Sequence, residues 1–234
     1  MTKRIEHLLK NSHLPGPRGN LGLLYLFSKN ASENEVNECL SFYNEDLSNS
    51  PEEFVVMCGI VGYCILNNNN IKKTLTNIRK YASHSSWRIR ESVAIGIQEI
   101  TENHKVEILT NLKKWMSGND LEKRAIVAAL CEPKLLKEKS FVNELLEILN
   151  QITLDFEKIE GKLSGNQISL RKTLGYGWSV AIASLPKEGK IAFEKIAKYK
   201  NKHIKWIVKE NLKKNRLLVM DKQWVERLLT TSKS

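Results

Sequence analysis

One short frame of residues recurs along the chain from residue 89 onward: apolar, basic, two residues of any kind, apolar, three of any kind, apolar. The apolar positions i, i+4 and i+8 of such a frame share one face of an α-helix. Four copies begin 34, 47 and 34 residues apart, and the second is degenerate at its first position. The regular spacing of the copies predicts helical pairs that stack and bury their apolar faces against their neighbours. The copies are Ile89-Arg90-Val93-Ile97, Lys123-Arg124-Val127-Cys131, Leu170-Arg171-Leu174-Trp178 and Ile204-Lys205-Val208-Leu212.

Helical patterns fill the rest of the chain, with short breaks at polar, glycine and proline clusters and little strand alternation. We therefore expect an all-α fold in which residues 1–234 form one domain of repeats. The segment 157–167 is the one long connection, and we expect it to be either a loop or a small hairpin. The predicted helices lie near 3–11, 19–29, 33–47, 51–66, 71–84, 87–101, 104–117, 120–131, 140–156, 167–184, 187–199, 201–215 and 221–231.

The net charge of +11 is unevenly distributed along the chain. Residues 1–70 hold 5 Lys or Arg and 8 Asp or Glu, whereas residues 71–234 hold 32 and 18. Within the second part, residues 162–220 hold 14 basic and only 3 acidic residues. We interpret 1–70 as an acidic helical cap and 71–234 as basic repeats that contact a polyanion. A merely well-solvated lysine-rich surface is the alternative interpretation.

Four segments, HSSWRIRESVAIGIQEI, NDLEKRAIVAALCEP, SLRKTLGYGWSVAIA and HIKWIVKENLKKNRL, resemble HEAT repeats. Their order is similar to that in the DNA alkylation-repair HEAT-like family, which contains the bacterial alkylpurine DNA glycosylases and non-catalytic relatives. The resemblance covers about residues 71–216. It implies a right-handed α-solenoid (α-α superhelix, armadillo-like) whose basic concave face accepts duplex DNA. It also implies that Arg171, Lys172 and Trp178 lie near the bound nucleic acid.

The chain departs from the active glycosylases at one motif. Those enzymes carry an aspartate closely preceded by tryptophans, and no Trp-x-x-Asp arrangement occurs here. Glu91, one turn after Trp87, is the one substitute, although a surface partner of Arg88 or Arg90 is the commoner role for such a residue. The leading hypothesis is therefore a non-catalytic module that binds nucleic-acid backbone, with DNA favoured. The alternatives are a glycosylase that excises alkylated purines and a scaffold that binds an acidic protein.

Basic residues occupy the early turns of the predicted second helix of each pair. Stacking of the pairs would align them into a track of positive charge facing the regularly spaced phosphates of a nucleic acid. The alternative is that each one bonds to a carboxylate or carbonyl of the adjoining repeat. On one helix, Lys205, Lys209 and Lys213 form a further cationic stripe at i, i+4 and i+8. The candidate residues of the track are Arg88, Arg90, Lys123, Arg124, Arg171, Lys172 and Lys205.

The five tryptophans separate into core and candidate contact residues. Trp115 and Trp224 follow apolar helical spacing and are expected in the core. Trp87 and Trp206 stand beside cations, so their indoles could stack on a sugar or base while the cations hold phosphate. Trp178 falls on the packing stripe with Leu170 and Leu174, which favours the core despite the family likeness.

The remaining patterns predict no cofactor or metal. The four cysteines lie in apolar helical patterns without a CxxC pair and are expected to be buried, reduced thiols. The five histidines lie near helix ends, where helix-end or surface roles are expected. No apolar run approaches the roughly 20 residues that span a bilayer, and we see no secretion signal. A soluble, cytoplasmic protein without membrane contact is therefore expected.

Overall fold

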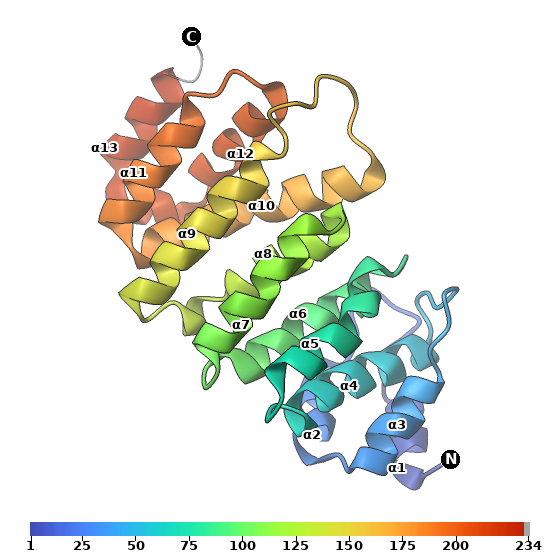
Figure 1. Ribbon diagram of the computed structural model, residues 1–234. Coiled ribbons are helices and arrows are strands. Elements are labelled where there is room, and N and C mark those ends of the chain that lie inside the picture. Colours follow the sequence, from blue (N-terminus) through green and yellow to red (C-terminus); the bar gives the residue numbers. More distant parts are fainter. Residues whose placement is uncertain (232–234) are drawn as a thin grey trace. The chain divides into compact units, whose positions relative to one another are not determined.

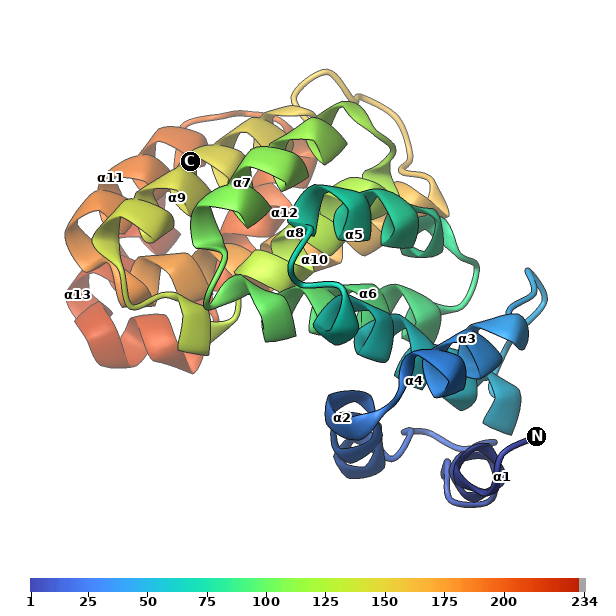
Figure 2. The same cartoon turned by 60° about the horizontal axis from the view of Figure 1, so that its bottom comes forward.

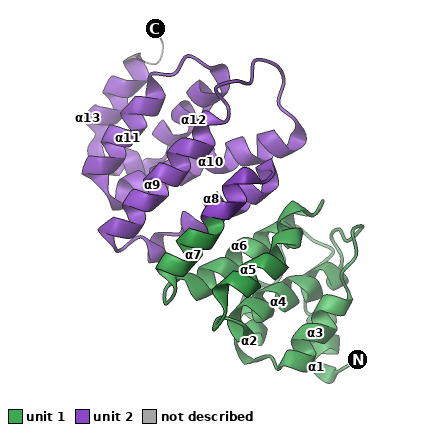
Figure 3. Ribbon diagram, viewed as in Figure 1, with its two compact units in different colours: residues 1–112 green, residues 113–234 purple. Residues whose placement is uncertain are grey.

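The computed structural model describes residues 1–231, and in that range it is all-helical, with thirteen α-helices, three short 3-10 helices and no strand (Figure 1). This confirms the predicted all-α class. The helices group into two compact units, unit 1 of residues 1–112 and unit 2 of residues 113–234 (Figure 3). The acidic-to-basic boundary at residue 70 lies inside unit 1, between α4 (Pro51–Leu66) and α5 (Ile71–Ile78).

Unit 1 is built around α4, which contacts α1, α2, α3, α5 and α6. This helix starts at Pro51, whose missing N–H suits a first turn, and Ser50 caps it. It is apolar on nearly all sides, as expected of a helix surrounded by others. The helices of unit 1 are α1 Lys3–Lys10, α2 Leu21–Asn30, α3 Glu33–Ser41, α4 Pro51–Leu66, α5 Ile71–Ile78, η1 Arg79–Ser83, α6 Trp87–Thr101 and α7 Lys105–Leu112.

Unit 2 has two layers of helices. The long helix α10 contacts both α8 and α12, and α11 contacts both α9 and α13. Figure 2 shows α9 beside α11 in the second of these layers. The helices of unit 2 are η2 Lys113–Ser117, α8 Asp120–Leu130, η3 Pro133–Leu135, α9 Lys139–Leu154, α10 Gly165–Ser184, α11 Pro186–Ala197, α12 Lys202–Leu212 and α13 Asn215–Thr231.

A fully buried asparagine joins α10 to α12. The side chain of Asn211 accepts a hydrogen bond from the backbone N–H of Ser179 at 2.8 Å and donates one to the carbonyl of Leu174 at 2.9 Å. The amide also donates to the carbonyl of Ile207 in its own helix at 2.8 Å. Asn211 therefore satisfies backbone groups in the middle of α10 that are shielded from water.

Several predicted helices differ from the observed ones in where they begin or end. The predicted helices 71–84 and 104–117 each finish as a separate 3-10 helix, η1 and η2. The last helix begins earlier than predicted and bends at Asp221, whose backbone is extended (φ −163°, ψ 90°). The connection before α10 forms turns and coil, so the hairpin alternative for 157–167 was wrong. No helix among residues 1–231 is both long and apolar enough to cross a membrane.

Candidate nucleic-acid interface

The two units differ sharply in charge. Unit 1 contains 12 basic and 12 acidic residues and is formally neutral. Unit 2 contains 25 basic and 14 acidic residues, so it carries the whole net charge of +11. A compact unit with a large net positive charge attracts polyanions.

Three exposed lysines of unit 2 keep their charge uncompensated. Lys205 and Lys209 lie one turn apart on α12, and Lys172 lies in the first half of α10. None of the three forms an ion pair with any other residue in the described range 1–231. Lys213, the third member of the predicted stripe, pairs with Glu210 one turn before it. Two of the three lysines in the stripe, Lys205 and Lys209, therefore have no carboxylate partner in the described range.

Arg171 stacks on Trp206 beside these lysines. Its guanidinium carbon lies 4.4 Å from the indole centroid, and its Nη1 lies 3.2 Å from Nδ1 of His203. No carboxylate pairs with Arg171 among the described residues, and its Nε has no hydrogen-bond partner there. Gly175 makes room for the indole, because a Cβ at this position would meet Cζ3 of Trp206 at 3.0 Å. The arrangement fixes a guanidinium in place without neutralising it.

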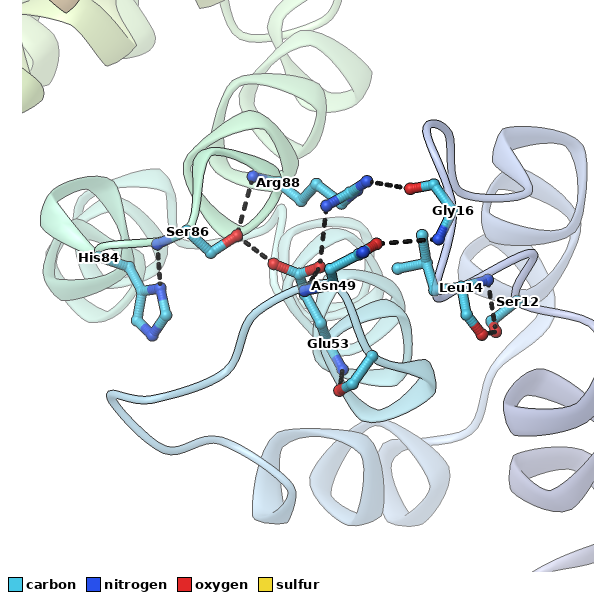
Figure 4. A network of polar contacts seen from close by, with 9 residues as sticks. Ser12, Leu14, Gly16, Asn49, Glu53, His84, Ser86 and Arg88 are labelled. Atoms are coloured by element: carbon cyan, nitrogen blue, oxygen red, sulfur yellow. Dashed lines mark hydrogen bonds and ion pairs between the residues drawn. The ribbon is translucent and has the colours of Figure 1, made fainter.

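Arg88 has a different role, because it is buried in an ion pair of unit 1 (Figure 4). Its Nη1 lies 3.4 Å from Oε2 of Glu53, and the two side chains are 8% and 0% exposed. Its Nη2 donates to the carbonyl of Gly16 at 2.6 Å. In this structure Arg88 is therefore not accessible to a nucleic acid. It bonds instead to a carboxylate and a carbonyl of neighbouring segments, which is the alternative role considered for the basic residues.

The carboxylate of Glu53 connects four segments of unit 1 (Figure 4). It accepts hydrogen bonds from the hydroxyl of Ser86 and from the backbone N–H of Asn49, the latter at 2.9 Å. Asn49 in turn accepts from the N–H of Gly16 at 2.9 Å. The starts of α4 and α6 and the two loops before α2 and α4 thus meet at one buried charge pair.

Three further candidates of the track have interactions with other residues of the chain. Arg90 donates from Nη1 to the carbonyls of His84 and Ser85, at 2.5 and 2.6 Å. Lys123 pairs with Asp155 at 2.8 Å. Arg124 is half-buried and also has an interaction within the chain. Of the predicted basic residues, those with uncompensated charge are confined to α10 and α12.

The structure separates the tryptophans as the packing stripe predicts. Trp178 is fully buried, and its indole N–H donates to Oγ1 of Thr153 at 2.9 Å, so it offers no face to a ligand here. Trp115 and Trp224 are also buried. Trp206 is half-buried under Arg171, and Trp87, 50% exposed, lies 4.7 Å from the guanidinium of Arg88. Of the three candidate tryptophans, only Trp87 and Trp206 are therefore accessible in this structure, and Trp178 is a core residue.

Sequence reasoning missed the burial of two histidines. His84 and His203 are 2% and 5% exposed, although surface or helix-end roles were predicted for them. Both do lie near helix ends, His84 directly after η1 and His203 in the first turn of α12, but each is also hydrogen-bonded to a loop distant in sequence. The partner is the carbonyl of Asn44 for the first and of Gly161 for the second. Sequence spacing carries no signal for such a contact, because about 40 residues separate each pair.

The cysteines are buried and free, as predicted. Burial raises the pKa of the Cys39 and Cys64 thiols to about 12 and raises that of Cys58 and Cys131 as well. At neutral pH these thiols are uncharged and contribute apolar packing.

Comparison with known proteins gives no match: no family model, curated protein or solved structure matches the chain. The features of the chain that bear on its function are therefore the charge, burial and contacts of its own residues. Those point to α10 and α12 of unit 2.

Proposed function

We propose that unit 2 binds nucleic acid, with DNA as the favoured ligand, through contacts to the sugar–phosphate backbone. The contact residues are Lys172, Lys205 and Lys209, together with Arg171 on its Trp206 platform. Backbone contacts position a protein without reading bases, so binding is expected to be independent of sequence. No chemical step is part of this function.

The uncompensated lysines of α10 and α12 are the observation that supports the proposal most strongly. A lysine paired with a carboxylate gives up that pair on binding phosphate, whereas Lys172, Lys205 and Lys209 lose only water. Neutralised phosphates release their condensed counterions, which favours binding at low salt. An arginine stacked on an aromatic ring adds a rigid donor fork for phosphate oxygens.

The proposal extends to the architecture. We propose that the helical pairs form a right-handed solenoid of the HEAT type, related to the DNA alkylation-repair HEAT-like proteins, with its basic side as the binding face. The layering within unit 2 supports this, because α8, α10 and α12 follow one another in contact, as second helices of consecutive pairs do. The recurring frame begins in or near the first half of each of these helices.

Replacing both Lys205 and Lys209 by alanine is expected to weaken DNA binding about tenfold or more at low salt. Each lost phosphate contact lowers the slope of log K against log salt by about one, so the slope should fall by about two. Fluorescence anisotropy with a short labelled duplex over a series of salt concentrations measures both quantities.

The matched control replaces Lys72 and Lys73 by alanine. These two lysines are also exposed and unpaired among the described residues, and they lie on α5 of the neutral unit 1. The control removes the same net charge, so it separates a local contact from a general effect of charge. An equal loss in both variants would contradict the assignment to α12. Absence of binding to duplex DNA, single-stranded DNA and RNA at low salt would remove the proposed function itself.

A further inference from the structure

Unit 1 contains a surface groove that the proposed nucleic-acid contact does not use. The groove has a volume of about 380 Å³ and lies where residues of α3, α4, α5 and η1 meet. This volume is within the range of small-molecule sites, roughly 300–1,000 Å³. Its lining, which we call the η1 groove, includes Leu40, Tyr63, Asn77, Ile78, Lys80 and Tyr81.

The apolar part of the η1 groove comes from three different elements. Ile78 belongs to the buried stripe of α5, and Tyr81 of η1 is packed nearly as tightly, so they are only 1% and 6% exposed. Leu40 of α3 and Tyr63 of α4 are half-buried. Aliphatic and aromatic side chains arranged in this way offer a flat apolar group a place out of water.

Lys80 places a positive charge in this apolar groove. Its Nζ lies 4.9 Å from the ring centroid of Tyr81 and 5.7 Å from that of Tyr43. The two rings pack edge to face, with their centroids 4.9 Å apart. Attraction between a cation and aromatic faces holds an ammonium in place without neutralising it. Lys80 forms no ion pair with any other residue in the described range 1–231.

The acidic residues of this part of unit 1 bind other partners. Glu45 accepts a hydrogen bond from the hydroxyl of Tyr43 at 2.6 Å. On α3, Glu35 pairs with an arginine of α1 at 2.9 Å, and Glu38 accepts from the backbone N–H of Thr2 at 2.9 Å. None of the described residues that line the groove is acidic. The charge of Lys80 is therefore left for a ligand.

A second hydrogen-bond donor is available at the η1 groove. The side-chain amide of Asn77 donates to the hydroxyl oxygen of Tyr63 at 2.5 Å. Tyr63 is the acceptor in this bond, so its own hydroxyl proton can be donated to another group. In the described part of the chain that hydroxyl has no further partner. A carboxylate oxygen is an acceptor of the required kind.

We propose that the η1 groove binds a small aromatic carboxylate. Its ring packs on Leu40, Ile78 and Tyr81, and its carboxylate accepts from the ammonium of Lys80 and the hydroxyl of Tyr63. One ammonium balances one negative charge, which fits a monocarboxylate better than a phosphate monoester with its charge of about −1.5 to −2. Every residue of the site belongs to unit 1, so the proposal is independent of nucleic-acid binding by unit 2.

The test is an NMR titration of the full chain with 1-naphthoate, beside the uncharged 1-naphthamide of nearly the same shape. We expect naphthoate to bind with a Kd on the order of 1 mM, as the size of this ligand allows. The amide should bind about tenfold more weakly, because it lacks the charge that Lys80 recognises. Nuclear Overhauser effects should connect the naphthalene protons to the methyl groups of Leu40 and Ile78.

Two lysine variants separate the site from general electrostatics. Lys80→Gln should weaken binding of naphthoate about tenfold and leave that of the amide unchanged, which also shows that the groove is still folded. Lys10→Gln is the matched control, since Lys10 is an exposed lysine of unit 1 that has no ion pair among the described residues and does not line the groove. It should bind both compounds as wild type does.

A Tyr63→Phe protein tests the second donor. It should bind naphthoate about threefold or more weakly, because one neutral hydrogen bond is lost. Equal affinity of wild type for naphthoate and the amide, or an unchanged affinity of Lys80→Gln for naphthoate, would overturn the proposal. Overhauser effects only to methyl groups outside the η1 groove would overturn it as well. Each of these results would leave the function proposed for unit 2 standing.

Discussion

Replacing Arg88 by alanine is expected to lower the free energy of unfolding of unit 1 by about 3–5 kcal/mol, because it leaves the carboxylate of Glu53 buried without its counter-charge. Glu53 is fully buried, so water cannot replace the guanidinium. The carbonyl of Gly16 would lose its 2.6 Å hydrogen bond as well. The starts of α4 and α6 both depend on this pair.

Urea unfolding followed by far-UV circular dichroism measures the effect. Arg18→Ala is the matched control, since Arg18 is an exposed arginine of the same unit without a partner among the described residues, and it should change stability by less than about 0.5 kcal/mol. Adding Glu53→Gln to Arg88→Ala should recover part of the loss, because no unpaired charge then remains buried. Equal stability of the Arg88→Ala and Arg18→Ala proteins would show that the ion pair does not hold unit 1 together.

Replacing Asn211 by alanine is expected to destabilise unit 2 by about 2–5 kcal/mol. The change removes three buried hydrogen bonds, which contribute about 0.5–1.5 kcal/mol each, and leaves a cavity where the amide was. It also loosens the contact between α10 and α12, the helices that hold Arg171 and Trp206 together. DNA affinity should therefore fall along with stability.

Asn143→Ala controls for the change of residue type. Asn143 is exposed on α9 and has no partner in the described part of the chain, and alanine is the better helix former there. Thermal unfolding of the two variants should differ clearly, with the Asn143→Ala protein at least as stable as wild type. A small effect of Asn211→Ala would mean that other groups or water satisfy the backbone of α10.

The helices could be predicted from the sequence because local signals define them. Pro51 after Ser50, and Trp87 after Ser86, mark starts that the structure places at the same residues. The ends of α5 and α7 were placed less well, because a change from α-helix to 3-10 helix leaves the apolar spacing almost unchanged. The bend at Asp221 coincides with the predicted helix start at 221, and there the carboxylate accepts a hydrogen bond from the backbone N–H of Trp224 at 3.0 Å, as a residue that caps a helix start does.

The roles of the basic residues could not be predicted from their place along the helices. Arg88 and Arg171 both lie in the first half of their helices, yet one pairs with a buried glutamate and the other has no carboxylate partner among the described residues. The difference arises from Glu53, which lies 35 residues before Arg88. The scarcity of acids in 162–220 was the useful signal, since it leaves Arg171 and the lysines of α12 with few possible partners.

Lysine reactivity toward a small acylating reagent, compared by mass spectrometry with and without DNA, tests the proposed interface most directly. Lys172, Lys205 and Lys209 should be protected by bound DNA at low salt, and the protection should disappear at high salt. Lys72 and Lys73 on α5 should react equally in both states. Unchanged reactivity at Lys205 and Lys209 in a complex that demonstrably contains DNA would contradict the assignment of the binding surface to α10 and α12.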